Sequence, residues 1–141
     1  RCSRGKVTVS QKIIGKIDHG LVILLGVQKD DSEIDADFLV NKISGLRIFA
    51  DENDKMNLSI KDITGSALVI SQFTLCGDTK KGRRPSFINA APPEYGNRLY
   101  EYFLSELGKT GVSVQSGEFG AMMDVELVND GPVTFVLNSK D

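Results

Sequence analysis

The stretch Leu21-Val22-Ile23-Leu24-Leu25-Gly26-Val27 decides the class of fold. Its apolar residues do not alternate with polar ones, which is typical of a strand that is buried on both faces. A second run of this kind extends from Ala67 to Phe73. Both runs are far shorter than the roughly 20 apolar residues that cross a bilayer. We therefore expect two buried strands and no membrane span.

Shorter strands and two helices are expected around these runs. An amphipathic helix follows the capping residues Asp30-Asp31-Ser32 and extends to Gly45 and beyond, through Leu46, and a second helix begins at Pro92-Pro93 and ends at Gly108. Apolar residues in the pattern of short strands lie at Val7 to Val9, Ile13 to Ile17, Arg47 to Ala50, Val112 to Val114, Val125 to Val128 and Val133 to Leu137.

The length and the charge balance describe one ordinary globular domain. The chain has 141 residues, with 17 Lys and Arg against 19 Asp and Glu. A chain of this size buries roughly two-thirds of its unfolded surface, so residues 1–141 form a single domain with one real core. Two helices among short strands, with strands adjacent at both ends of the chain, favour an α/β fold. We expect mixed β-sheets that form a sandwich or a half-rolled barrel, with two flanking helices.

The composition also restricts the chemistry. His19 is the only histidine and lies in a turn, so two-histidine zinc sites are excluded and any Ser-His or Cys-His catalysis would depend on this one residue. Cys2 and Cys76 are far apart, so reduced thiols are expected. We expect no metal and no cofactor. The first residues lead into no apolar segment, so a cytoplasmic location follows by default.

Three segments carry the candidate functional residues. Ser71 to Leu75 places hydroxyl and amide groups at the end of a buried strand, where polar side chains cap the strand or build a site. Asn129 to Thr134 contains a Gly-Pro bond, which forms either a plain turn or a cis peptide with a fixed pose. Lys80 to Arg84 is the densest basic segment of a chain whose net charge is -2. Such a segment suits contact with a phosphate backbone.

Taken together, these segments resemble the signature segments of the D-aminoacyl-tRNA deacylase family. The resemblance covers essentially the whole chain, because further family-like segments follow in the right order. They are Leu46 to Phe49, Lys55 to Ser59, Lys81 to Phe87 and Ala90 to Glu94. The resemblance implies a homodimeric esterase that removes D-amino acids, and glycine, from the 3′-terminal adenosine of tRNA. It also implies an active site at the dimer interface.

The resemblance further implies the roles of individual residues. In the family, the strand-end motif surrounds the terminal adenosine and the scissile ester. A cis Gly-Pro reaches into the partner's pocket, where its carbonyl oxygens face the substrate α-amino group and leave no room for an L side chain. The expected catalytic residues are Ser71, Gln72, Phe73 and Thr74. The expected substrate-binding residues are Gly131, Pro132, Thr134, Arg1 and Met123, and the expected tRNA-binding residues are Lys80, Lys81, Arg83 and Arg84.

The chemistry of the ester leads to a mechanism without histidine. An aminoacyl ester is already activated, so its hydrolysis needs a positioned water and stabilisation of the oxyanion more than it needs a strong base. We expect the Phe73 N–H to stabilise the oxyanion and the substrate ribose 2′-OH to orient or relay the water. The rival mechanism uses Thr74 as a covalent nucleophile, although no base is visible beside it in the sequence.

Two other functions stay open at this point. One is a related editing enzyme that has the opposite loop pose and removes certain L-amino acids. The other is a non-catalytic nucleic-acid-binding dimer that uses the basic loop from Lys80 to Arg84. A third interpretation is a structural dimer with neither function, whose strand-end polar residues only satisfy backbone groups. Arg1 matches the arginine that follows the family's short opening strand, so we expect the first strand to be truncated.

Overall fold

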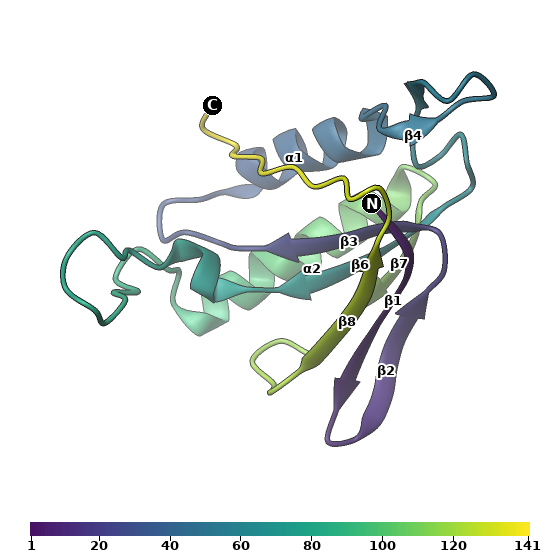
Figure 1. The fold of residues 1–141 in the computed structure, drawn as a ribbon. Coiled ribbons are helices and arrows are strands. Elements are labelled where there is room, and N and C mark those ends of the chain that lie inside the picture. Colours follow the sequence, from purple (N-terminus) through teal and green to yellow (C-terminus); the bar gives the residue numbers. More distant parts are fainter.

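The strands form one curled, mixed sheet in the computed structural model, which describes all 141 residues (Figure 1). The strand order is β2-β1-β3-β6-β7, and β8 pairs with β1 off this path. β2 and β7, the two ends of this order, come into contact, so the sheet is nearly closed. This arrangement confirms the half-rolled barrel. The strands are β1 (Cys2–Val9), β2 (Lys12–Ile17), β3 (Gly20–Leu25), β6 (Ser66–Ser71), β7 (Ser113–Ser116) and β8 (Asp124–Asn129).

The two apolar runs form the parallel pair β3 and β6 at the centre of the sheet. Alternate residues of β6 face two different cores, because successive side chains of a strand point to opposite faces. Ala67 and Val69 belong to the larger core, and Leu68 and Ile70 belong to the smaller core inside the curled sheet. All four side chains are buried, as the uninterrupted apolar run predicts.

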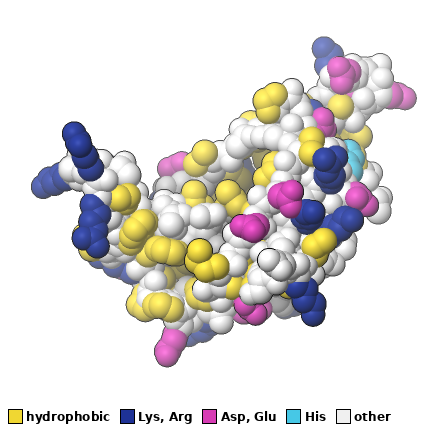
Figure 2. All heavy atoms as spheres, turned by 60° about the horizontal axis from the view of Figure 1, so that its bottom comes forward, with side chains coloured by type: hydrophobic (Ala, Val, Ile, Leu, Met, Phe, Trp, Pro, Cys, Tyr) yellow, Lys and Arg dark blue, Asp and Glu magenta, His cyan; other side chains and the backbone are white.

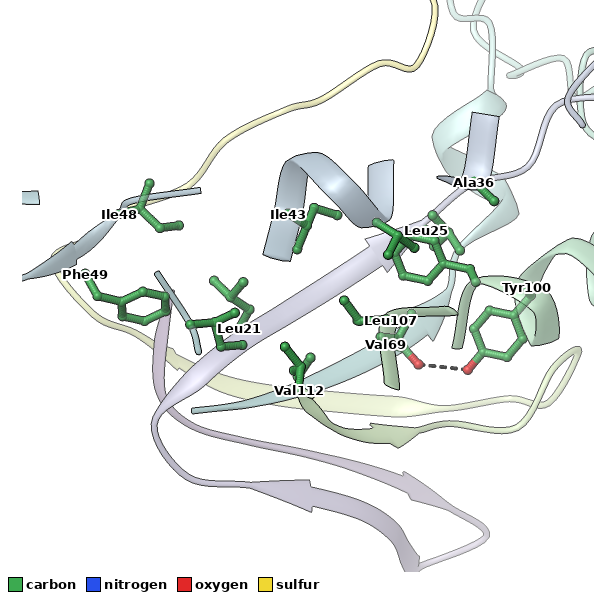
Figure 3. Close-up of a cluster of buried hydrophobic side chains, with 14 residues drawn as sticks. Leu21, Leu25, Ala36, Ile43, Ile48, Phe49, Val69, Tyr100, Leu107 and Val112 are labelled. Carbon is green, nitrogen blue, oxygen red and sulfur yellow. Dashed lines mark hydrogen bonds between the residues drawn. The ribbon is translucent and has the colours of Figure 1, made fainter. Parts of the chain in front are cut away.

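The larger core lies between β3, β6 and the helices α1 (Glu33–Gly45) and α2 (Pro93–Lys109). Figure 3 shows side chains from both helices that point at the central strands, and the buried Tyr100 hydroxyl donates a hydrogen bond of 2.8 Å to the Val69 carbonyl. Ser32 precedes α1 and its N–H donates to Asp35 Oδ2, so the predicted cap is present. Neither helix is long and apolar enough to cross a membrane.

A small hairpin and a C-terminal strap complete the chain. The hairpin consists of β4 (Phe49–Ala50) and β5 (Met56–Leu58), so the strand expected from Arg47 is only two residues long. The strand expected over Val133 to Leu137 is absent, and that prediction is wrong. Residues 133–139 instead form a strap without regular secondary structure, which runs in front of α1 toward the start of that helix (Figure 1). This segment pairs with no strand of the sheet, and a β-strand exists only as part of such a ladder.

The far end of the strap is fastened to α1 by Asp35. Asp35 Oδ1 accepts hydrogen bonds from Ser139 Oγ at 2.9 Å and from Lys140 Nζ at 2.8 Å. The hydrogen bond from Lys140, followed by the one from the Ser32 N–H, lowers the pKa of the Asp35 carboxyl from 3.8 to about 2. The strap is therefore tethered through charge at a point remote from the Gly-Pro loop.

This tether predicts a loss of stability in acid. The Asp35 carboxyl has a lower pKa in the folded chain than in the unfolded chain, so its ionised form stabilises the fold at pH values above the unfolded pKa of 3.8. That stabilisation disappears as the pH falls toward the folded pKa of about 2. Urea unfolding measures the free energy of unfolding at each pH. Between pH 5 and pH 2 this free energy should fall less in Asp35→Asn than in the wild type. Asp30→Asn, at an exposed carboxylate before the same helix, is the control and should follow the wild type. Parallel acid profiles of wild type and Asp35→Asn would contradict the assignment.

Candidate functional site

The polar strand-end segment lies at the carboxyl edge of the parallel pair. β3 ends at Leu25 and β6 ends at Ser71, and these two residues are register partners. The Gln72 N–H then donates to the Leu25 carbonyl at 2.8 Å, and the chain turns into the 3₁₀ helix η1 (Phe73–Cys76). The strand therefore ends two residues earlier than expected. The turn points Gln72 and the residues of η1 out of the sheet instead of continuing its ladder.

Two of the predicted catalytic residues are exposed in η1. Phe73 and Thr74 face solvent, and Gln72 Nε2 donates to Thr74 Oγ1 at 2.5 Å. The hydrogen bonds of η1 begin with the Leu75 N–H, which donates to the Gln72 carbonyl. The Phe73 and Thr74 N–H groups precede this bond, so helix geometry leaves them without a partner inside η1. These main-chain donors are suited to binding an anion or a developing oxyanion.

Cys76 is in the same helix but is unsuited to act as a nucleophile. Its Sγ lies 3.5 Å from the Val27 carbonyl, and the residue is buried. Burial raises the pKa of the Cys76 thiol, and a protonated thiol is a poor nucleophile. Cys2 is also buried, and both cysteines are free, as predicted.

The Gly-Pro segment follows β8 as an exposed loop. The Gly131-Pro132 peptide bond is cis, as hypothesised, and Gly131 has a φ of +122°. Asn129 holds the loop from within, because its Oδ1 accepts from the Val133 N–H at 3.0 Å and its Nδ2 donates to Thr134 Oγ1 at 2.7 Å. These side-chain bonds replace a strand ladder in fixing the loop.

Arg1 holds the same loop from outside. Its Nε donates to the Asp130 carbonyl at 3.2 Å and lies 3.3 Å from Asp130 Oδ2. Its Nη1 donates to the Ile48 carbonyl at 2.9 Å. Only 14% of the Arg1 side chain is exposed, so the planar guanidinium is fixed between the loop and the segment before β4. Arg1 therefore positions Gly131-Pro132 through Asp130.

One chain does not bring the strand-end segment and the Gly-Pro loop together. Cys2 is the register partner of both Asn129 and Gly20, which places the loop at the start of β3. Ser71 and the residues after it lie at the end of β3. Five residues of extended strand separate these two ends, which corresponds to about 17 Å. In Figure 1 the end of β8 lies near the start of β3, whereas the short teal helix η1 lies beyond the other end of β3.

An apolar groove connects the two ends. It has a volume of about 510 Å³ and lies between β3, α1 and the strap. Leu75 and Cys76 line one end, and Asn129 and Thr134 line the other. Several large apolar side chains beside it are exposed, which is unusual for the surface of a monomer. They include Leu24, Leu75, Leu127, Phe135 and Val136.

Met123 and the basic residues lie elsewhere on the surface. Met123 packs on the smaller core, with its Sδ 2.6 Å from where a Cβ on Gly117 would stand. That position fits the gap-filling use of methionine, and its role in substrate binding stays a prediction. Figure 2 shows Lys and Arg side chains gathered on a projection at the left of the molecule. The predicted tRNA-binding residues Lys80, Lys81, Arg83 and Arg84 are exposed on this loop after η1.

Sequence reasoning did not assign a role to Asn129 inside the Gly-Pro loop or to Phe87 beside η1. Asn129 carries both side-chain bonds inside the loop, and Phe87 packs against Phe73 with ring centroids 5.1 Å apart. Asparagine before a Gly-Pro turn is a recognisable signal for a side-chain bond to the backbone. The contact of Phe87 has no comparable signal, because it depends on how the basic loop returns to η1.

The sequence and the fold of this chain are similar to those of known proteins. A family model described as D-Tyr-tRNA(Tyr) deacylase matches residues 1–138. The chain is 56% identical to a D-aminoacyl-tRNA deacylase of Koribacter versatilis, over 99% of this chain and 94% of the relative. It is 58% identical to a D-aminoacyl-tRNA deacylase of Clostridioides difficile, over 99% and 93%. A solved structure named c-Myc DNA Unwinding Element Binding Protein is similar, with a TM-score of 0.88 and 39% identity over 94% of this chain and 91% of that one.

Proposed function

Because the chain belongs to the D-Tyr-tRNA(Tyr) deacylase family, we propose that it hydrolyses the ester between a D-amino acid and the 3′-terminal adenosine of tRNA. The observation that carries this proposal is the identity above 50%, over nearly the full length, to relatives named D-aminoacyl-tRNA deacylase. The product is a free tRNA and a free D-amino acid. The activity is chiral proofreading in translation, and we infer a cytoplasmic location, where charged tRNA is used.

The active site is assembled from two copies of the chain. The strand-end segment and the Gly-Pro loop lie at opposite ends of β3, so one chain cannot place both on one substrate. A two-fold dimer contributes the same surface from each copy and so produces two equivalent sites. The exposed apolar side chains along the groove, such as Leu75 and Phe135, support this pairing because they need a cover.

The chemistry at each site is the attack of water on the activated ester. The water oxygen bonds to the ester carbon, the carbonyl oxygen becomes an oxyanion, and the C–O bond to the ribose breaks with a proton passing to the ribose oxygen. The Phe73 N–H, exposed at the start of η1, stabilises the oxyanion, and each such donor is worth roughly 10² to 10³ in rate. The ribose 2′-OH of the substrate orients the attacking water or relays its proton. Gln72 and Thr74 hydrogen-bond beside this point.

The Gly-Pro loop selects the D form by excluding the L form. Contacts with an apolar pocket separate similar side chains by only about 1 to 3 kcal/mol, whereas a fixed main chain converts a wrong-handed Cβ into a clash. Asn129 and Arg1 hold the carbonyl groups of Gly131 and Pro132 in place for this purpose. Because main-chain atoms perform the selection, D-amino acids of different size are accepted, and so is glycine, which has no Cβ.

The alternative of a non-catalytic nucleic-acid-binding dimer rests on the same basic loop. The solved structure with a DNA-binding name is similar over most of the chain. The relatives with more than 50% identity are named as deacylases, however, so we assign the loop to binding of the tRNA substrate. Salt-sensitive binding of tRNA is then expected together with ester cleavage.

Hydrolysis of D-tyrosyl-tRNA and L-tyrosyl-tRNA by the purified protein, with and without a metal chelator, tests the proposal. We expect rapid release of D-tyrosine, little release of L-tyrosine, and no effect of the chelator. Preferential release of the L form would indicate the related editing activity instead. Binding of tRNA without release of either amino acid would indicate the nucleic-acid-binding module.

A further inference from the structure

An exposed pair of aromatic rings lies directly beside the strand-end segment. Phe73 is 57% exposed and Phe87 is 38% exposed, although aromatic side chains of this size are mostly buried. Their ring centroids are 5.1 Å apart with an interplanar angle of 64°. The Phe73 main chain belongs to the proposed oxyanion site, whereas its ring extends away from it toward Phe87. The pair is therefore adjacent to the substrate ester without being part of the chemistry.

The backbone around Phe87 holds this pair in place. The basic loop closes at its base through two hydrogen bonds between the main chains of Asp78 and Ser86, at 2.8 and 2.9 Å. Phe87 follows this closure directly. Its Cε1 stands 2.9 Å from where a Cβ on Gly77 would lie, so the ring packs closely over Gly77. The Asn89 carbonyl then accepts from the Lys29 N–H at 3.0 Å, which fastens the segment to the end of β3.

The charge next to the pair is strongly positive. Lys80, Lys81, Arg83 and Arg84 lie on the loop that Phe87 follows, and none of them has a carboxylate within 4.0 Å. Figure 2 shows apolar side chains next to this basic projection. Aromatic faces flanked by unpaired cations are the combination that binds single-stranded nucleic acid, because bases stack on the rings while phosphates meet the cations. The centre of an interface between protein copies is instead depleted of charge.

We propose that Phe73 and Phe87 form a stacking platform for the unpaired nucleotides that precede the terminal adenosine of the tRNA. This inference rests on the proposed function, which places the adenosine ester at the Phe73 main chain. The nucleotides that precede the adenosine leave the site past the Phe73 ring and toward the basic loop. The platform adds affinity for the 3′ end of the tRNA and is independent of which amino acid is attached.

Two ester substrates of different length distinguish the contribution of the platform from that of the catalytic site. The wild type should hydrolyse the D-tyrosyl ester of the trinucleotide CCA with a kcat/KM at least about fivefold above that for D-tyrosyl-adenosine, because stacking of the added bases contributes binding. Phe87→Ala should lower kcat/KM for D-tyrosyl-CCA by at least about fivefold, mainly through KM, and leave that for D-tyrosyl-adenosine unchanged. Phe87→Tyr should keep both values. Ile88→Ala, at a neighbour that is 75% exposed, should also resemble the wild type.

Several results would overturn the platform. One is an equal kcat/KM of the wild type for the two esters, which needs no variant and so does not depend on folding. Others are an equal loss on both esters in Phe87→Ala, or dissociation of the dimer in that variant by analytical ultracentrifugation. Hydrolysis of neither ester by the wild type would instead contradict the proposed function, so the two failures are distinguishable.

Discussion

Gly131→Ala is expected to lower kcat/KM for D-tyrosyl-tRNA by at least about 100-fold, because a displacement of about 1 Å in a site costs that much. Gly131 has a φ of +122°, which L residues rarely adopt. An added Cβ would stand 2.6 Å from Val133 Cγ2, 3.0 Å from the Val133 nitrogen and 3.3 Å from Arg1 Nη2. The loop must move, and the wall that faces the substrate moves with it.

The control for this variant is Gly111→Ala. Gly111 also has a positive φ, of +99°, but no atom lies within 4 Å of its added Cβ. It follows α2, far along the chain from both motifs. Gly111→Ala should lose some stability but keep the wild-type rate of hydrolysis. The comparison therefore distinguishes the effect of backbone strain from the effect of displacing the Gly-Pro loop. Steady-state hydrolysis of D-tyrosyl-tRNA and L-tyrosyl-tRNA measures both variants. Wild-type rate and wild-type selectivity in Gly131→Ala would show that the loop takes no part.

Phe73→Pro is expected to lower the single-turnover rate by about 10² to 10³ relative to Phe73→Ala, which is the typical loss for one oxyanion donor. Proline removes the Phe73 N–H together with the phenyl ring, whereas alanine removes the phenyl ring alone. Phe73 is the first residue of η1, a position at which proline is tolerated because its N–H has no partner inside the helix. The comparison therefore isolates the main-chain donor.

The rival mechanism, with Thr74 as a covalent nucleophile, is tested by a Thr74 variant. If Thr74 formed a covalent intermediate, Thr74→Val would abolish hydrolysis, and the wild type would accumulate an acyl-enzyme. The only hydrogen bond of the Thr74 hydroxyl is with Gln72, and an amide is no general base. We expect Thr74→Val to retain measurable activity. Equal single-turnover rates of Phe73→Pro and Phe73→Ala would remove the oxyanion role from the Phe73 N–H.

Much of the fold follows from apolar patterning. The uninterrupted runs at Leu21 to Val27 and Ala67 to Phe73 predict strands that are buried on both faces, and β3 and β6 are such strands. The segment at Val133 to Leu137 has the same local pattern but forms a strap. Its apolar side chains line a groove instead of a sheet, and a strand needs a free edge as well as a pattern.

Residue patterns alone predicted the parts of the candidate site, whereas its assembly across two copies was implied only by the family resemblance. Polar residues at a strand end and a Gly-Pro turn are visible in the sequence. Their separation by the full length of β3 depends on the pairing of Cys2 with Asn129 and Gly20, which joins segments distant in the chain. The anchoring of Gly131 by Arg1 through Asp130 is equally non-local. The three-dimensional arrangement therefore supports a second copy in the proposed site.

Mixing two inactive variants tests this shared site most directly. Gly131→Ala damages the loop, and Phe73→Pro damages the strand end, so a mixed dimer carries one site with both parts intact and one with both damaged. Random exchange at equal concentrations makes half of the dimers mixed, and the mixture should recover about a quarter of the wild-type activity on D-tyrosyl-tRNA. If activity after complete exchange stays at the average of the two separate variants, each chain builds its site alone and the account is wrong.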